Sequence, residues 1–290
     1  MEVSDLEKKI IKRFKDFDPV HIFECGQCFR WVRQEDGSFT GVAGGKVLNV
    51  KKEGEDIIFS NTDEEEFQNF WRNYFDLDTD YGKIKEELRK NDSVMDEAVD
   101  FGQGIRILKQ DPWEMLISFI ISANNRIPMI MRGVKLLSEK YGEFICDFRG
   151  EKYYSFPAPE KFLSGEISDI RVSGIGFRDK YIYNTASKFV DEKIDLDLLR
   201  NKDFDDMKKG LMQFSGVGPK VSNCIALFSL DALDAFPVDT WVKKVMEYFY
   251  LHEDTDLKVI EDFSRKKFGK LSGYAQQYLF YYAREKKIGK

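Results

Sequence analysis

The stretch that most constrains this chain is Ser215-Gly216-Val217-Gly218-Pro219-Lys220, between two apolar segments. The run before it predicts the end of a helix, and a second apolar segment begins at Val221. Two glycines two positions apart allow a turn at φ values that other residues avoid. Pro219 suits the first turn of a new helix, where its missing N–H is not needed. The stretch predicts a helix, a tight glycine hairpin and a second helix, whose free N–H groups favour a bound phosphate.

Lys220 falls in the first turn of this second helix. The helix dipole disfavours a cation there, and with burial it should lower the pKa of the amine and free it as a nucleophile. One helix further on, Asp239 precedes the helical segment 241–250 and is placed as its N-cap. The plain alternatives are a solvated surface lysine, a helix cap without chemistry, and an ordinary loop between core helices.

A glycine hairpin, a lysine directly after it and a capping aspartate one helix later resemble the helix-hairpin-helix DNA glycosylase superfamily. The hairpin alone also occurs in DNA-binding proteins without catalysis, so the joint spacing carries the resemblance. It implies that Lys220 and Asp239 are catalytic, and the lysine is typical of members that also cut the strand. It further implies that Gly216, Val217 and Gly218 hold a DNA phosphate, often with a monovalent cation at the hairpin carbonyls. No redox cofactor and no catalytic metal is required.

The charge balance limits how this chain can bind DNA. The 290 residues include 45 Lys+Arg and 51 Asp+Glu, a formal net charge of −6, which argues against a general polyanion binder. Basic residues crowd 243–244, 265–267 and the tail, so we expect a local basic face and a modest, salt-sensitive affinity. The charged N-terminus lacks the apolar region of a signal peptide, and no apolar stretch is long enough to span a membrane. We expect a monomeric, cytoplasmic protein associated with the nucleoid of a prokaryote.

The chain has four cysteines, which could in principle bind a metal: Cys25, Cys28, Cys146 and Cys224. The first two have a CxxC spacing, but no second pair or histidine partner follows, which argues against zinc. The cysteine cluster that holds iron and sulfur in some superfamily members is also missing from the sequence. Free thiols in a reducing cytosol are the favoured interpretation.

The expected fold is α+β, with an N-terminal antiparallel β-sheet domain followed by a mostly α-helical helix-hairpin-helix domain. Strand-like runs punctuated by glycine turns predict an antiparallel meander, at 20–23, 29–32, 39–42, 46–50 and 57–59. Helices are expected at 63–75, capped by Thr62 or Asp63, and then through Leu88. We place the domains at 1–107 and 108–290, with the helix-hairpin-helix at about 207–230. The second begins with a helix that has Asp111 as cap, Pro112 in first position and Glu114 in third.

The segment Cys25-Gly26-Gln27-Cys28-Phe29-Arg30-Trp31 is either a strand bend over core side chains or a close backbone approach to a ligand. It resembles the Gly-Gln-x-Phe-Arg-Trp segment of the 8-oxoguanine DNA glycosylases. In that family the glycine carbonyl accepts a hydrogen bond from the N7–H of 8-oxoguanine, and guanine has no such donor. The resemblance implies this role for Gly26.

The helix that begins at Pro112 ends in Ser122-Ala123-Asn124-Asn125-Arg126-Ile127-Pro128-Met129, which resembles the Asn-Asn end of the same family. The resemblance implies that Asn124 contacts the strand opposite the lesion. In eukaryotic relatives an arginine then reads the estranged cytosine, whereas here Met129 takes that place and Arg126 lies nearby. A methionine lacks paired donors, so we expect relaxed discrimination of the opposite base.

The run Ser173-Gly174-Ile175-Gly176-Phe177-Arg178 resembles the family's Gly-x-Gly-aromatic-Arg turn. The resemblance implies that Phe177 wedges beside the estranged base and that Arg178 lies near a phosphate. The alternative for Phe177 is a core position.

Near the C-terminus, Gly273-Tyr274-Ala275-Gln276-Gln277-Tyr278-Leu279-Phe280 resembles the family's Gly-Trp-Ala-Gln-x-x-Leu-Phe. Gln276 and Phe280 are four residues apart and share one helix face. The resemblance implies that Gln276 reads the Watson–Crick edge of the flipped base, while Phe280 stacks on one face and the sulfur of Cys224 covers the other. With Gly26 these residues describe a slot for one planar purine.

The resemblance spans Gly26 to Phe280 and implies a bifunctional DNA repair enzyme. It would flip 8-oxoguanine out of double-stranded DNA, excise it through a Schiff base on Lys220, and cleave the strand by β-elimination. The alternatives are a glycosylase of this superfamily for another damaged base, and a non-catalytic DNA-binding module. Lys220 argues against the monofunctional enzymes that remove alkylated bases, and Gly26 and Gln276 argue against a pyrimidine substrate.

Overall fold

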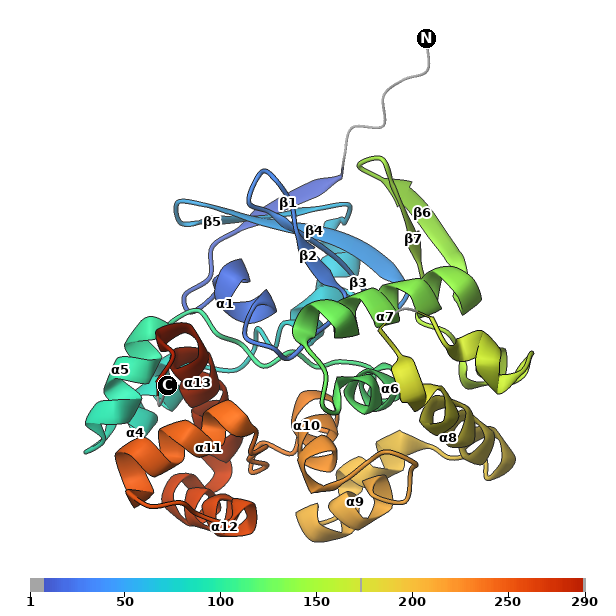
Figure 1. The fold of residues 1–290 in the computed structure, drawn as a ribbon. Helices are drawn as coiled ribbons and strands as arrows, with labels where there is room; N and C mark the ends of the chain where they lie inside the picture. Colours follow the sequence, from blue (N-terminus) through green and yellow to red (C-terminus); the bar gives the residue numbers. More distant parts are fainter. Residues whose placement is uncertain (1–7, 173, 289–290) are drawn as a thin grey trace.

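The computed structural model describes residues 8–172 and 174–288. In that part of the chain an antiparallel sheet of five strands lies at one end of the molecule, above most of the helices in Figure 1. The strand order is β1-β5-β4-β3-β2, so β2 to β5 form a meander and β1 pairs with β5. The strands are β1 (Lys9–Lys12), β2 (Trp31–Arg33), β3 (Phe39–Ala43), β4 (Lys46–Glu53) and β5 (Asp56–Ser60). The predicted fold class is confirmed.

The strand predicted at 20–23 is wrong, because these residues belong to helix α1 (Pro19–Phe23). The side chain of Asp18 accepts a hydrogen bond from the Val20 N–H at 3.0 Å, and Pro19 fills the first helical position. A cap and a proline together override the β-branched pattern that favoured a strand. Strand β1 was not predicted, since none of its residues is buried and its apolar alternation is weak.

The helix predicted from residue 63 is present and begins as expected. Asp63 is its N-cap and accepts from the Glu66 N–H at 3.0 Å. The segment is built of α2 (Glu64–Glu66), a π-helical turn η1 (Phe67–Trp71) and α3 (Arg72–Tyr74), and is followed by α4 (Tyr81–Arg89) and α5 (Ser93–Phe101). The start of α6 (Pro112–Ser122) is also confirmed, with Asp111 accepting from the Glu114 N–H at 2.7 Å.

The rest of the chain is mostly helical, with one exception. After α7 (Ile127–Tyr141), the strands β6 (Phe144–Phe148) and β7 (Glu151–Tyr154) form an antiparallel hairpin that the sequence pattern missed. Its Phe148 packs on Val42 and Val47 of the first sheet, so a tertiary contact stabilises it. The remaining elements are η2 (Pro159–Leu163), η3 (Ile167–Ile170), η4 (Gly176–Arg178), α8 (Asp179–Asp191), η5 (Leu196–Asn201), α9 (Phe204–Leu211), α10 (Pro219–Ser229), α11 (Thr240–Met246), η6 (Glu247–Leu251), α12 (Leu257–Phe268), η7 (Gly269–Leu271) and α13 (Ser272–Lys286).

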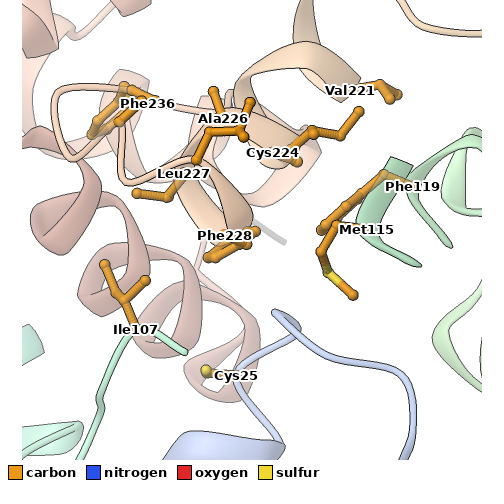
Figure 2. Close-up of a cluster of buried hydrophobic side chains, with 14 of the residues drawn as sticks. Cys25, Ile107, Met115, Phe119, Val221, Cys224, Ala226, Leu227, Phe228 and Phe236 are labelled. Carbon is orange, nitrogen blue, oxygen red and sulfur yellow. The ribbon is translucent and has the colours of Figure 1, made fainter. Parts of the chain in front are cut away.

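Buried apolar packing fixes the helices that carry the candidate site. Helices α6 and α10 are buried along almost their whole length and pack against each other. Figure 2 shows Met115 and Phe119 of α6 across from Cys224 and Phe228 of α10, and the rings of Phe119 and Phe228 stack at 5.7 Å. Helix α13 packs against α5 and α11. Because apolar burial dominates folding energetics, these helices form a rigid frame.

The loop that carries Gly26 is anchored between the sheet and α6. Gln27 is fully buried, and its side-chain amide donates to the carbonyls of Ile22 and Arg106 at 2.9 and 2.7 Å. A little further along the loop, Arg30 forms a buried ion pair with Glu114 of α6 at 3.4 Å. The Gly-Gln-x-Phe-Arg part of the sequence motif therefore has a structural role around its glycine.

Candidate active site

The predicted helix, hairpin and helix are present as α9, the turn 212–218 and α10. Gly216 has a φ of +83°, and a Cβ at this position would lie 2.9 Å from the ring of Tyr181, so glycine is required. Gly218 has an ordinary φ of −99° and is the N-cap of α10. A Cβ on Gly218 would meet nothing within 4 Å, so the packing of this chain does not itself demand glycine there. Pro219 begins α10, as expected.

Lys220 is the second residue of α10 and reaches toward α6. Its Nζ lies 5.6 Å from the centroid of the Phe119 ring, and it interacts with the sulfur of Cys224 one turn later. Nothing in the sequence distinguishes Phe119, because it belongs to a continuous apolar run with no sign of a second role. The aromatic ring and the sulfur confine the amine.

The pKa of the Lys220 amine shifts in the direction opposite to the predicted one. Burial lowers this pKa, but Cys224 and the Asp239 carboxylate favour the ammonium form and together raise the pKa above the ordinary lysine value. Lys220 therefore rests protonated and must lose a proton before it can act as a nucleophile. Burial also raises the pKa of the Cys224 thiol.

Asp239 is the N-cap of α11, which confirms its predicted position. One carboxylate oxygen accepts from the N–H groups of Trp241 and Val242 at 2.9 and 2.8 Å. Burial raises the pKa of this carboxyl, although the capping hydrogen bonds and the charge of Lys220 oppose the shift. The side chain thus stabilises the start of a helix and faces the lysine.

A cleft of about 840 Å³ brings together residues that are far apart in the sequence. The predicted site residues that line it are Asn124, Arg126, Met129, Lys220 and Asp239. Thr240, Lys243 and Leu257 also line it and were not predicted. Lys243 is paired with Asp254 at 2.6 Å and with Glu247 at 3.1 Å.

The turn after α6 presents the first asparagine and uses the second to hold the turn. Asn124 is exposed with a φ of +51°, a left-handed conformation that asparagine tolerates well. The side-chain amide of Asn125 donates to the carbonyls of Ile121 and Gly174 at 3.1 and 3.0 Å. This bond joins the Asn124 turn to the turn that carries Phe177.

Arg178, which we expected beside a phosphate, is buried. Its guanidinium donates to the carbonyls of Ala123, Asn124 and Ile175. A buried guanidinium must place its N–H donors on nearby acceptors, and these hydrogen bonds stabilise the turn that contains Asn124. Ser173, the first residue of this motif, lies outside the described residues.

Two apolar side chains stand exposed beside the cleft. Phe177 is 59% exposed and Met129 is 37% exposed, so the core alternative for Phe177 is excluded. The guanidinium of Arg178 lies 4.6 Å from the centroid of the Phe177 ring and supports it. Large apolar groups held in solvent at the edge of a cleft are typical of a surface that meets a partner.

The residues of the predicted purine slot come from the Gly26 loop, α10 and α13. Gly26 has a φ of +81°, and a Cβ there would lie 2.9 Å from Cε1 of Phe280, so the ring leaves no room for a side chain at this position. Gln276 is only 4% exposed, and its Oε1 has no hydrogen-bond partner among the described residues. A buried orphan acceptor is costly unless a ligand satisfies it.

An arginine that sequence analysis missed connects this slot to the cleft. Arg284 lies over the Phe280 ring at 5.3 Å from its centroid. Its charge also opposes the rise that burial causes in the pKa of Asp239. The charge of Arg284 is therefore close enough to Phe280 and to Asp239 to act on both. Its place in a basic C-terminal run made Arg284 resemble an ordinary solvated residue.

The predicted local basic face is partly neutralised by ion pairs. Arg265 pairs with Asp234 at 3.5 Å, and Lys267 pairs with Asp92 at 2.9 Å. Arg126 is exposed on the wall of the cleft.

All four cysteines are free thiols, as predicted, and Cys25, Cys28 and Cys224 are buried. Within residues 8–172 and 174–288, no group of three or more His, Cys, Asp or Glu side chains is arranged to hold a metal ion. In the same ranges, none of the helices combines the length and apolar character needed to cross a bilayer.

Comparisons with known proteins find related chains. A family model described as 8-oxoguanine DNA glycosylase, N-terminal domain, matches residues 9–116. The probable N-glycosylase/DNA lyase of Methanothermobacter thermautotrophicus is 32% identical over 213 residues, covering 67% of this chain and 68% of that protein. The N-glycosylase/DNA lyase of Saccharomyces cerevisiae is 31% identical over 255 residues, covering 79% of this chain and 67% of that protein.

Among solved structures, the 8-oxoguanine glycosylase/lyase of Clostridium acetobutylicum, bound to dsDNA with cytosine opposite 8-oxoG, is 48% identical. The match covers 97% of each chain with a TM-score of 0.93. On the combined strength of these relatives and the confirmed architecture, the chain belongs to the 8-oxoguanine DNA glycosylase family.

Proposed function

We propose that this chain excises 8-oxoguanine from double-stranded DNA and then cleaves the strand, as a combined N-glycosylase and DNA lyase. The observation that carries the proposal is the convergence of Lys220 and Asp239 at one cleft, which Asn124 and Met129 also line, with Cys224 interacting with the Lys220 amine. The relatives from yeast and Clostridium carry names that state both activities.

The chemistry begins with proton loss from Lys220, which rests as an ammonium ion. Asp239, whose own pKa is raised by burial, faces the amine and is suited to take that proton. The amine lone pair then bonds to the sugar C1′, and the C1′–N9 bond breaks. Its electron pair leaves with the base, which takes up the proton that Asp239 received from Lys220. Asp239 is thereby ionised again and stabilises the positive charge that develops on the sugar.

Opening of the sugar ring then gives a Schiff base between Lys220 and C1′. This imine acidifies the C2′ proton, whose loss drives β-elimination of the 3′ phosphate. The strand is thus cut 3′ to the lesion.

Lesion recognition rests on the purine slot. The Gly26 carbonyl accepts the N7–H of 8-oxoguanine, Gln276 bonds its Watson–Crick edge, and Phe280 and Cys224 cover its two faces. The orphan Oε1 of the buried Gln276 supports this role, because a purine N–H would complete its hydrogen bonding.

DNA is held around the cleft by residues from several elements. Asn124 and Arg126 face the strand opposite the lesion, Phe177 wedges beside the estranged base, and Met129 takes the place of a cytosine-reading arginine. In the hairpin Gly216-Val217-Gly218, the open space above Gly218 leaves room for a phosphate, and the hairpin carbonyls are suited to a monovalent cation. We assign Arg178 a supporting role behind Asn124.

The proposal also includes the two-region organisation, 1–107 and 108–290, and action as a monomer. The purine slot would form where Gly26 of the first region meets α13 of the second.

Borohydride trapping on a duplex with a single 8-oxoguanine tests this function. A covalent adduct that is lost in Lys220→Gln, while that variant still binds the duplex, is the expected result. Comparing the yield opposite each of the four bases tests whether Met129 relaxes the preference for cytosine. No adduct from the wild type on any of the four duplexes would overturn the assignment, and panels of alkylated purines and oxidised pyrimidines would then separate another lesion from simple DNA binding.

A further inference from the structure

Two side chains of α13 donate hydrogen bonds to consecutive carbonyls in the loop that carries Gly26. Arg284 donates to the carbonyl of Glu24, and the side-chain amide of Gln277 donates to the carbonyl of Cys25 at 3.3 Å. The same amide lies 3.1 Å from the Cys25 sulfur. Gln277 and Arg284 are two helical turns apart, so they project from one face of α13.

Both gripping side chains are themselves held in place. Gln277 is 2% exposed, and the side chain of Arg284 is 18% exposed. The guanidinium is further paired with Glu285 at 2.9 Å and lies over the Phe280 ring. A guanidinium over an aromatic face adds a cation–π attraction and leaves the other face for a stacked base.

The next carbonyl along the loop, that of Gly26, receives no hydrogen bond from any residue that the structure describes. The two carbonyls before it are engaged, so the peptide planes leading to Gly26 have little freedom to rotate. Gln27, on the other side of this peptide, is held by the carbonyls of Ile22 and Arg106, so α13 fixes the chain on the near side of the Gly26 carbonyl and thereby helps to set its direction.

We infer that Gln277 and Arg284 form a clamp that aims the Gly26 carbonyl at the N7 position of the flipped base. This inference rests on the proposed function. 8-Oxoguanine and guanine differ at N7 by one donor, so discrimination depends on where one acceptor points. Both clamp side chains are positioning residues, because they act through Gly26 and Phe280.

The experiment compares Arg284→Met, Arg284→Lys and Gln277→Leu with the wild type in single-turnover assays. Lys286→Met is the matched control, since it removes one positive charge from the last turn of the same helix, and its lysine lies over Phe101. Two substrates are used: a duplex with 8-oxoguanine, and a duplex with a preformed abasic site that presents no base. Affinity for 8-oxoguanine relative to guanine duplexes is measured in the Lys220→Gln background.

We expect Arg284→Met and Gln277→Leu each to slow base release roughly tenfold, the scale of one lost hydrogen bond to a buried acceptor. Their relative affinity for 8-oxoguanine over guanine should fall by a similar factor. Cleavage of the abasic duplex should stay within about twofold, Arg284→Lys should recover part of the loss, and Lys286→Met should match the wild type.

Base release at the wild-type rate in Arg284→Met and Gln277→Leu would overturn the clamp. A parallel loss of abasic cleavage in Gln277→Leu, which changes no charge near Asp239, would also overturn it, because that result means general disruption. If Arg284→Met does not fold, Gln277→Leu and Arg284→Lys decide by the same criteria. Failure of the proposed function is separately visible, since the wild type would then leave the 8-oxoguanine duplex intact.

Discussion

Asp239 has two roles that substitution can separate. Its carboxylate caps α11 with hydrogen bonds of 2.9 and 2.8 Å, and it faces the Lys220 amine, whose pKa it helps to raise. Asp239→Ala removes both roles. Asp239→Asn keeps an oxygen that can cap the helix and removes only the charge.

The two roles differ in magnitude. Loss of the cap costs about 1 kcal/mol, which corresponds to a fall in melting temperature of about 2 °C for a chain of this size. Loss of the charge should slow base release about a hundredfold, since it removes the stabilisation of the cationic sugar. The same loss lowers the pKa of Lys220 and increases its neutral fraction, an opposing effect that we expect to be smaller than the loss in the transition state.

Asp203→Ala is the matched control, because Asp203 caps α9 with a bond of 2.9 Å to the Asp206 N–H on an exposed surface. Thermal melts should show similar losses for Asp203→Ala and Asp239→Ala and almost none for Asp239→Asn. Single-turnover assays should show slow base release for both Asp239 variants and wild-type rates for Asp203→Ala. Wild-type base release by Asp239→Asn would refute the reasoning and reduce Asp239 to a helix cap.

Three further predictions address the slot, the estranged base and pH. In Gly26→Ala the rate of base release should fall at least tenfold, while cleavage of abasic DNA in the same gel assay should be retained. The added Cβ would be strained at this φ and would lie 2.9 Å from Phe280, so the loop would be displaced. Met129→Arg should raise the ratio of trapping opposite cytosine to trapping opposite adenine, since it supplies paired donors; an unchanged ratio would contradict this role. Between pH 6 and 8 the rate of imine formation on abasic DNA should rise with pH, because the pKa of Lys220 lies above its ordinary value and only the neutral amine attacks. A flat profile would show that proton loss from Lys220 does not limit this step.

Much of the fold could be predicted because caps and turns are local. The starts of α6 and α11 follow from Asp111 with Pro112 and from Asp239, where a few adjacent residues satisfy the free N–H groups of a helix. Helix α1 begins by the same rule, because Asp18 caps it and Pro19 is its first residue. The apolar run that follows nevertheless favoured a strand. The β6–β7 hairpin had no comparable local signal, because it depends on Phe148 packing against a distant sheet.

The sequence by itself determined which groups this chain brings to its candidate site: a hairpin, a lysine in its second helix, a capping aspartate, and the glycine and glutamine that we propose to recognise the base. Only the tertiary structure decided how those groups behave. In the folded chain Arg178 is buried and donates to the carbonyl of Asn124. Gln277 and Arg284 donate to carbonyls of the loop that carries Gly26. The tertiary structure also reversed the expected pKa shift of Lys220. The physical reason is that electrostatic and hydrogen-bond energies depend on distance and burial. Folding brings Asp239, at the start of α11, close to Lys220 and Cys224 on α10.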